Sequence, residues 1–140
     1  MSATLLGTIA RTPEPQVALR RFLALDAVVT TANGVAYLAF PAAIGRLLGV
    51  GQGLLLGLGV LLALYGAGVG WLASRRQPPR LAVRLVVEVN YAWAALSLVA
   101  LVVWFSPTAA GLVWIPAQAA TVASFAVLQQ LALRSGSALQ

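Results

Sequence analysis

LALDAVVTTANGVAYLAF, residues 23–40, has the length and the apolar character of a membrane-spanning helix, but it contains polar side chains at a regular spacing. They are Asp26, Thr30, Asn33 and Tyr37. Intervals of four, three and four residues, at about 100° per residue, place all of them on one face of a helix. Because an ionised side chain in a membrane costs roughly 3 kcal/mol on insertion scales, Asp26 is a candidate functional residue.

The composition of the whole chain is also that of a membrane protein. Of its 140 residues 61% are hydrophobic and 9% are charged, which excludes an ordinary soluble domain. Four apolar runs are long enough to cross about 30 Å of hydrocarbon: residues 22–40, 54–72, 81–105 and 109–133. We predict an all-α polytopic membrane protein, with four transmembrane helices in an antiparallel bundle at residues 20–134 and cytoplasmic tails at residues 1–19 and 135–140.

The arginines predict the orientation of the bundle. They gather before the first run, between the second and third runs and after the fourth: Arg11, Arg20, Arg21, Arg75, Arg76, Arg80, Arg84 and Arg134. Only Arg46 lies in the other two connections. By the positive-inside rule both termini face the cytoplasm, so we predict a multi-pass protein of the cell membrane. The net charge of +6 then meets anionic membrane lipids, and nucleic acid is excluded as a partner.

The connections and the second run carry helix-packing signals. Pro41 opens an amphipathic segment that ends near Gly49, which predicts a short interfacial helix or a re-entrant cap on the outer face between the first two spans. Ser106 as N-cap with Pro107 after it predicts the start of the fourth helix and a tight hairpin. Small residues recur in the second span at Gly53, Gly57, Gly59, Ala63, Gly66, Ala67 and Gly70. They predict either a packing face within the chain or the seam of a homodimer.

Polar faces are also expected on the last two spans. On the third span Arg84, Glu88 and Tyr91 share one face, with Asn90, Trp93 and Ser97 roughly opposite, and on the fourth Trp114, Gln118, Thr121, Phe125 and Gln129 are aligned. Asp26 and Glu88 lie at similar distances beyond an arginine, so we expect both carboxylates at one depth, facing one cavity. The predicted ligand-binding residues are Asp26, Thr30, Asn33, Tyr37, Arg84, Glu88, Tyr91, Trp93, Gln118 and Thr121.

Two interpretations of these polar faces stay open. In one, they are interhelical contacts worth about 0.6–2 kcal/mol each, in which Glu88 pairs with Arg84 and Asp26 pairs with an arginine. In the other, they line a cavity that is open to the cytoplasm or the inner leaflet and receives a small amphiphile. The number of polar positions on the first span favours the cavity.

The residues admit three functions. We favour the binding of a small lipophilic or amphiphilic ligand, in an accessory or carrier role, because this function requires the fewest specific roles of the side chains. A membrane enzyme would use Asp26 and Glu88 as catalytic residues for acid–base isomerisation, cyclisation or epoxide opening of a lipophile. A proton-coupled exporter would use one of them as its carrier. Because the chain contains no Cys and no His, we predict no metal and no cofactor.

The runs LALDAVVTTANGVAYLAF and PAAIGRLLGV, residues 23–50, and VNYAWAALSLV, residues 89–99, resemble an uncharacterised family of small four-helix integral membrane proteins that is common in actinobacteria. A more distant similarity is to the DoxX-like group, which shares the size, the four spans and an amphipathic stretch after the first span. The resemblance extends from Leu19 to Arg134. It implies a four-helix bundle and no particular activity.

Overall fold

The computed structural model describes residues 15–103 and 107–139, and within them the fold is all-helical. The helices are α2 (Pro15–Ala39), α3 (Pro41–Leu48), α4 (Gln52–Ser74), α5 (Arg80–Val103) and α6 (Ala109–Leu139). All but α3 are long and apolar enough to cross a membrane. This confirms the predicted all-α fold with four candidate transmembrane helices, and α3 is the short helix expected after Pro41.

The first and last helices extend beyond the predicted spans. α2 begins at Pro15 rather than near Phe22, because Ala18 and Leu19 are buried and the helix continues through them. α6 continues to Leu139. Residues 15–19 and 135–139, predicted as tails, therefore belong to helices. The remainder of the predicted tails, residues 1–14 and 140, lies outside the described residues, as do residues 104 and 105 at the end of the predicted third span.

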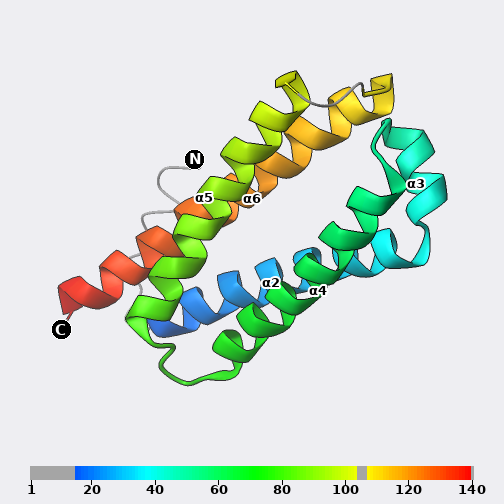
Figure 1. The fold of residues 1–140 in the computed structure, drawn as a ribbon. Coiled ribbons are helices and arrows are strands. Elements are labelled where there is room, and N and C mark those ends of the chain that lie inside the picture. The colour runs from blue at the N-terminus through cyan, green and yellow to red at the C-terminus, as the bar shows by residue number, and fades with distance from the viewer. Residues whose placement is uncertain (1–14, 104–106, 140) are drawn as a thin grey trace.

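The four long helices form two antiparallel pairs. α2 lies beside α4 and α5 lies beside α6, and the pairs meet where α2 contacts α6 (Figure 1). α4 and α5 follow each other in the chain, but their backbones come close at few positions, and their side chains meet mainly toward one end of the bundle. The order around the bundle is therefore α4, α2, α6, α5, with one poorly closed side between α4 and α5.

The α2–α4 pair is held close by small residues. A Cβ at Gly34 would lie 2.8 Å from the backbone nitrogen of Ala63, and one at Gly59 would lie 3.0 Å from the carbonyl oxygen of Gly34. Small residues let helix backbones approach in this way. The expected packing face within the chain is thus formed. A homodimer stays a prediction for the outward positions, such as Gly53 and Gly57, where an added Cβ would meet nothing within 4 Å.

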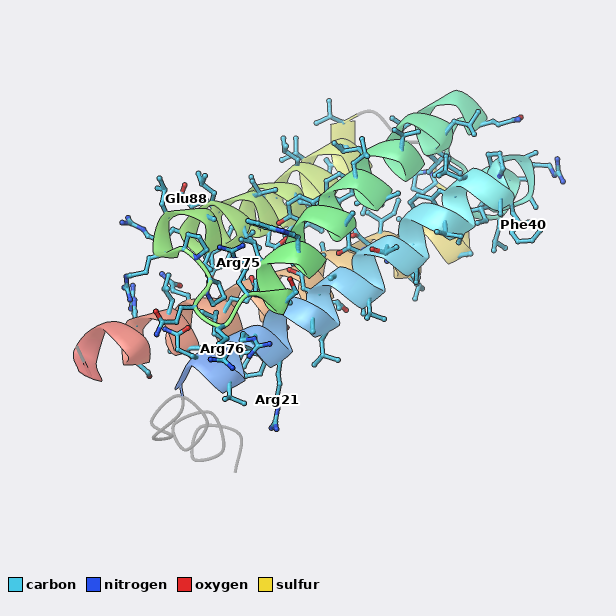
Figure 2. All side chains as sticks on the ribbon, turned by 90° about the horizontal axis from the view of Figure 1, so that it is seen from below. Arg21, Phe40, Arg75, Arg76 and Glu88 are labelled. Carbon is cyan, nitrogen blue, oxygen red and sulfur yellow. The ribbon has the colours of Figure 1, made fainter. Side chains whose placement is uncertain are left out.

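The two ends of the bundle differ in how tightly they are filled. Arg21, Arg75 and Arg76 lie at one end, here called the arginine end, and Phe40 and α3 lie at the other, the cap end (Figure 2). The main cluster of buried apolar side chains lies toward the arginine end: Leu19, Leu23, Ala27, Val69, Leu72, Val83, Val86, Ala132 and Leu133. The half toward the cap end contains cavities, which are described below.

Thr108 links α3 to α6 at the cap end through hydrogen bonds. The Thr108 hydroxyl accepts a hydrogen bond from the Gly111 N–H at 3.2 Å, as an N-cap does, and donates to the Leu47 carbonyl. The Thr108 N–H donates to the Leu48 carbonyl at 3.2 Å. α6 therefore begins at Ala109, one residue after this cap, and the predicted cap Ser106 lies outside the described residues.

Replacing Thr108 with Val is expected to lower the free energy of unfolding by about 1–2 kcal/mol, because it removes an N-cap and the hydroxyl's bond to the Leu47 carbonyl of α3. Thr121→Val is the matched control, since that exposed hydroxyl bonds only to the Ala117 carbonyl within α6. Thermal unfolding of the detergent-solubilised variants measures both. Equal melting temperatures for the two variants would contradict this role of Thr108.

Candidate functional site

Asp26 is the centre of a buried hydrogen-bond network that joins all four long helices. Its carboxylate, 1% exposed, accepts bonds from Asn90 Nδ2 at 2.8 Å, from Gln129 Nε2 at 2.8 Å and from the Thr30 hydroxyl at 3.1 Å. Asn90 Nδ2 also donates to Gln129 Oε1 at 3.1 Å, and Asn90 Oδ1 accepts from the Tyr65 hydroxyl at 3.0 Å. We call Asp26, Thr30, Tyr65, Asn90 and Gln129 the Asp26 network.

Every hydrogen-bond partner of Asp26 in the structure is neutral. Two amide donors converge on Oδ2 and one hydroxyl donates to Oδ1. The interpretation in which Asp26 pairs with an arginine is therefore wrong: the guanidinium of Arg20 instead donates to the Ala73 carbonyl at 3.0 Å. A buried polar group that is fully hydrogen-bonded in this way fixes the arrangement of the helices that supply its partners.

The second carboxylate does not join the first. Glu88 and Arg84 are both exposed, and Figure 2 shows Glu88 on the outer side of α5. Asn90 takes the inward position instead, because residues two apart on a helix lie about 200° apart. The expectation that both carboxylates face one cavity is wrong. Nor does the structure, which describes both residues, contain an ion pair between Arg84 and Glu88.

Two more of the predicted ligand-binding residues lie outside the bundle interior. Tyr91 is 37% exposed, and its hydroxyl donates to Gln130 Oε1 at 3.2 Å. Thr121 is exposed and bonds back to its own helix. Both residues sit beside the inward face of their helix rather than on it, so a small rotation of the helix decides their environment.

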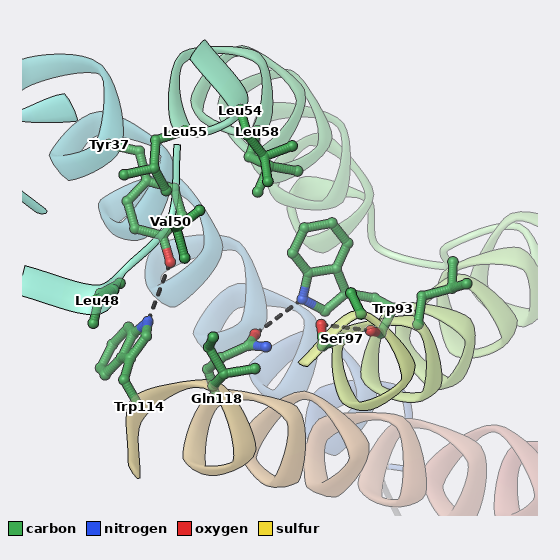
Figure 3. Close-up of a pocket in the computed structure, with 13 residues that line it drawn as sticks. Tyr37, Leu48, Val50, Leu54, Leu55, Leu58, Trp93, Ser97, Trp114 and Gln118 are labelled. Atoms are coloured by element: carbon green, nitrogen blue, oxygen red, sulfur yellow. Dashed lines mark hydrogen bonds between the residues drawn. The ribbon is translucent and has the colours of Figure 1, made fainter. Parts of the chain in front are cut away.

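The interior of the cap-end half contains a cleft between α4 and α5. It consists of a cavity of about 220 Å³ and an adjoining one of about 100 Å³, which share Tyr37, Trp93 and Gln118 as lining residues. We call them together the α4–α5 cleft. Its walls are mostly leucines and aromatic rings (Figure 3). Among the described residues that line it, none is charged.

The Asp26 network forms the inner boundary of this cleft. Thr30, Tyr65 and Asn90 line the smaller cavity, so three members of the network present polar atoms to it. Asp26 itself lines neither cavity. The network therefore separates the cleft from the packed apolar cluster at the arginine end.

Most of the other polar groups of the cleft already have partners. Trp93 Nε1 donates to Gln118 Oε1 at 2.9 Å, and Trp114 Nε1 donates to the Tyr37 hydroxyl at 3.2 Å (Figure 3). Asn33 is the exception. Its half-buried side chain lines the smaller cavity, and among the described residues none is hydrogen-bonded to it. This amide keeps its two donors and its acceptor for a ligand.

The sequence located about half of this site. Thr30, Asn33, Tyr37, Trp93 and Gln118 were predicted to bind a ligand, and all of them line the cleft. Tyr65 and Asn90 were not predicted to do so. The position of Asn90 could have been found from Val83, Val86 and Val87, which lie on the same side of α5 and are all buried.

Comparison with known proteins adds no family to this description. No family model, no curated protein and no solved structure matches the chain.

Proposed function

We propose that this chain is a membrane protein that binds a neutral, hydrogen-bonding lipophile in the α4–α5 cleft, in an accessory or carrier role. The observation that carries the proposal is the Asn33 amide, a polar side chain to which none of the described residues is hydrogen-bonded, in an apolar cleft without a charged residue among those described in its lining. Leaving such a group unpaired in a membrane is costly, and a ligand that bonds to it removes that cost.

The chemistry of the lining favours an alcohol over an acid or an amine. An ionised head group would lose its hydration in the cleft and find no counter-charge among the lining residues. The Tyr65 and Thr30 hydroxyls already donate their hydrogens within the Asp26 network, so toward the cleft they offer oxygen lone pairs. Asn33 offers both donors and an acceptor. A hydroxyl group, which donates and accepts, matches this set.

Asp26 contributes to this function by positioning the polar boundary of the cleft. Its carboxylate holds the Asn90 amide and the Thr30 hydroxyl. An enzyme that needs two carboxylates at one substrate gains no support, because Glu88 lies on the outside of α5. An exporter that carries protons on Asp26 gains none either, since the carboxylate lines neither cavity of the cleft.

The distribution of the arginines favours one orientation in the membrane. We propose that the arginine end and both termini face the cytoplasm, as the positive-inside rule favours. The cleft, in the cap-end half, would then open to the hydrocarbon of the outer leaflet rather than to the inner leaflet or the cytoplasm. A lipophile could enter sideways from the membrane, between α4 and α5.

Retinol is a suitable probe, because tryptophan emission transfers energy to it and Trp93 and Trp114 line the cleft. We expect retinol to bind the detergent-solubilised protein, and retinoic acid, which has the same skeleton with a carboxylate, to bind less tightly. Asn33→Leu should weaken retinol binding about three- to tenfold, the range for one hydrogen bond in a membrane. Gln130→Leu, which removes an amide outside the cleft, should leave it unchanged.

The outcomes are distinct. Equal binding of retinol and retinoic acid, or equal loss in the Asn33 and Gln130 variants, would overturn the proposed site. Failure of the wild-type protein to bind retinol or any other neutral lipophilic alcohol would overturn the function.

A further inference from the structure

A second cavity, which is widely open to the surroundings of the protein, lies on another side of the bundle, between α2, α3 and α6. Its volume is about 750 Å³, and its lining is mostly small or aliphatic, including Ala36, Ile44, Leu47, Ala110, Val113 and Ala117. We call it the α2–α6 cavity. α2 and α6 are joined through Asp26 and Gln129 in the middle of the bundle, but toward the cap end alanines face the space between them.

The α2–α6 cavity adjoins the α4–α5 cleft through shared residues. Asn33, Tyr37 and Trp114 line both. The hydrogen bond from Trp114 Nε1 to the Tyr37 hydroxyl crosses from α6 to α2 at this boundary. Asn33 lies four residues before Tyr37, about 6 Å nearer the arginine end. Its unpartnered amide is thus bordered by both cavities.

The sizes of the two cavities indicate that each would hold a different part of the ligand. The two parts of the cleft, about 220 and 100 Å³, together reach only the lower end of the roughly 300–1,000 Å³ of typical ligand sites. The α2–α6 cavity adds further volume but has few polar groups. A hydrocarbon chain gains little from leaving lipid for another apolar surface, so such a cavity selects a chain by its shape and length.

We propose that the α2–α6 cavity is a chain-binding subsite of the same ligand site: it holds the hydrocarbon chain of a long neutral lipophile, such as an isoprenoid alcohol, whose head group bonds to Asn33. The inference rests on the proposed function and specifies its ligand class. A ligand bound in this way passes beside the Tyr37–Trp114 pair, with its head at the polar boundary of the cleft and its chain between α2 and α6.

The test compares two alcohols that share one head group, the short geraniol and the long geranylgeraniol. Ala117→Phe places a ring in the α2–α6 cavity, and Ala120→Phe, three residues along α6 at another exposed alanine, is the matched control outside it. Native mass spectrometry of the detergent-solubilised proteins measures the bound fraction of each alcohol. Val113→Trp fills the same cavity from a position that is 73% exposed, so it guards against a folding defect of the first variant.

We expect Ala117→Phe and Val113→Trp to weaken geranylgeraniol binding about tenfold while geraniol binds as in the wild type. Ala120→Phe should bind both alcohols normally. Wild-type binding of geranylgeraniol in both cavity variants would overturn the chain subsite and leave the proposed function standing. Loss of both alcohols in the two folded cavity variants would also overturn it, because the effect would not depend on the chain. Binding of neither alcohol to the wild type would overturn the proposed function itself.

Discussion

Replacement of Asp26 with Leu is expected to lower the free energy of unfolding by roughly 3–5 kcal/mol, the largest effect of any single polar substitution in this chain. The leucine leaves the Asn90 amide, the Gln129 amide and the Thr30 hydroxyl without their shared acceptor. Each of these donors is buried, so water cannot replace the lost bond. Interhelical hydrogen bonds in membranes average about 0.6 kcal/mol, but three donors to one carboxylate fail together here.

Asp26→Asn should cost about 1 kcal/mol, far less than the leucine. Both amide donors approach Oδ2, so the single oxygen of an asparagine can still accept from Asn90 and Gln129. The new NH₂ group would then face the Thr30 hydroxyl, which can turn from donor to acceptor. Comparing the two variants distinguishes the contribution of the hydrogen bonds to stability from that of the negative charge.

Unfolding by SDS in mixed micelles, followed by circular dichroism, measures both variants. Glu88→Gln is the control, because that carboxylate is exposed and should leave the stability unchanged. If Asp26→Leu were as stable as the wild type, the network would not hold the helices together. If Asp26→Asn were as unstable as Asp26→Leu, the negative charge itself would be required.

The network shows what sequence alone could predict. On α2 the polar face was correctly placed, because the spacing of Asp26, Thr30 and Asn33 fits only one side of a helix. On α5 two polar faces competed, one with Glu88 and one with Asn90. The charge of Glu88 favoured the face that contains it, and that face proved to be the outer one. What decided the outcome was the burial of the valines beside Asn90, since apolar packing fixes the rotation of the helix.

The cleft could not be predicted because it depends on which helices are neighbours. Consecutive antiparallel helices usually pack together, and α5 and α6 do so. α4 and α5 pack together only near residues 75–79, which join them, and along the rest of its length α4 packs against α2 instead. The resulting cleft is lined by side chains from three or more helices. The spacing of residues within one helix therefore cannot predict it. Tyr65 was missed for this reason. It is a lone polar residue in a span whose sequence pattern otherwise consists of small residues that predict helix packing.

The close contact between α2 and α4 gives the second large effect. Gly34→Val is expected to destabilise the fold by about 2–4 kcal/mol, because its side chain would force the helices apart along their length. A Cβ there would lie 2.8 Å from the backbone nitrogen of Ala63 and 2.9 Å from the carbonyl oxygen of Gly59. These are backbone atoms, so no change of rotamer relieves the clash. Gly57→Val, where an added Cβ meets nothing within 4 Å, is the matched control on α4.

A rescue experiment then tests the physical cause. At Gly66 the atom nearest to an added Cβ is the Thr31 hydroxyl oxygen, at the end of a side chain that can be shortened. Thr31→Ala should therefore recover part of the stability lost in Gly66→Ala, whereas no truncation of a neighbour can recover Gly34→Val. The same unfolding assay measures all of these variants. Equal stability of Gly34→Val and Gly57→Val would show that the two helices can separate without cost. The cost of separating α2 from α4 is what keeps that side of the bundle closed, in contrast to the open side between α4 and α5.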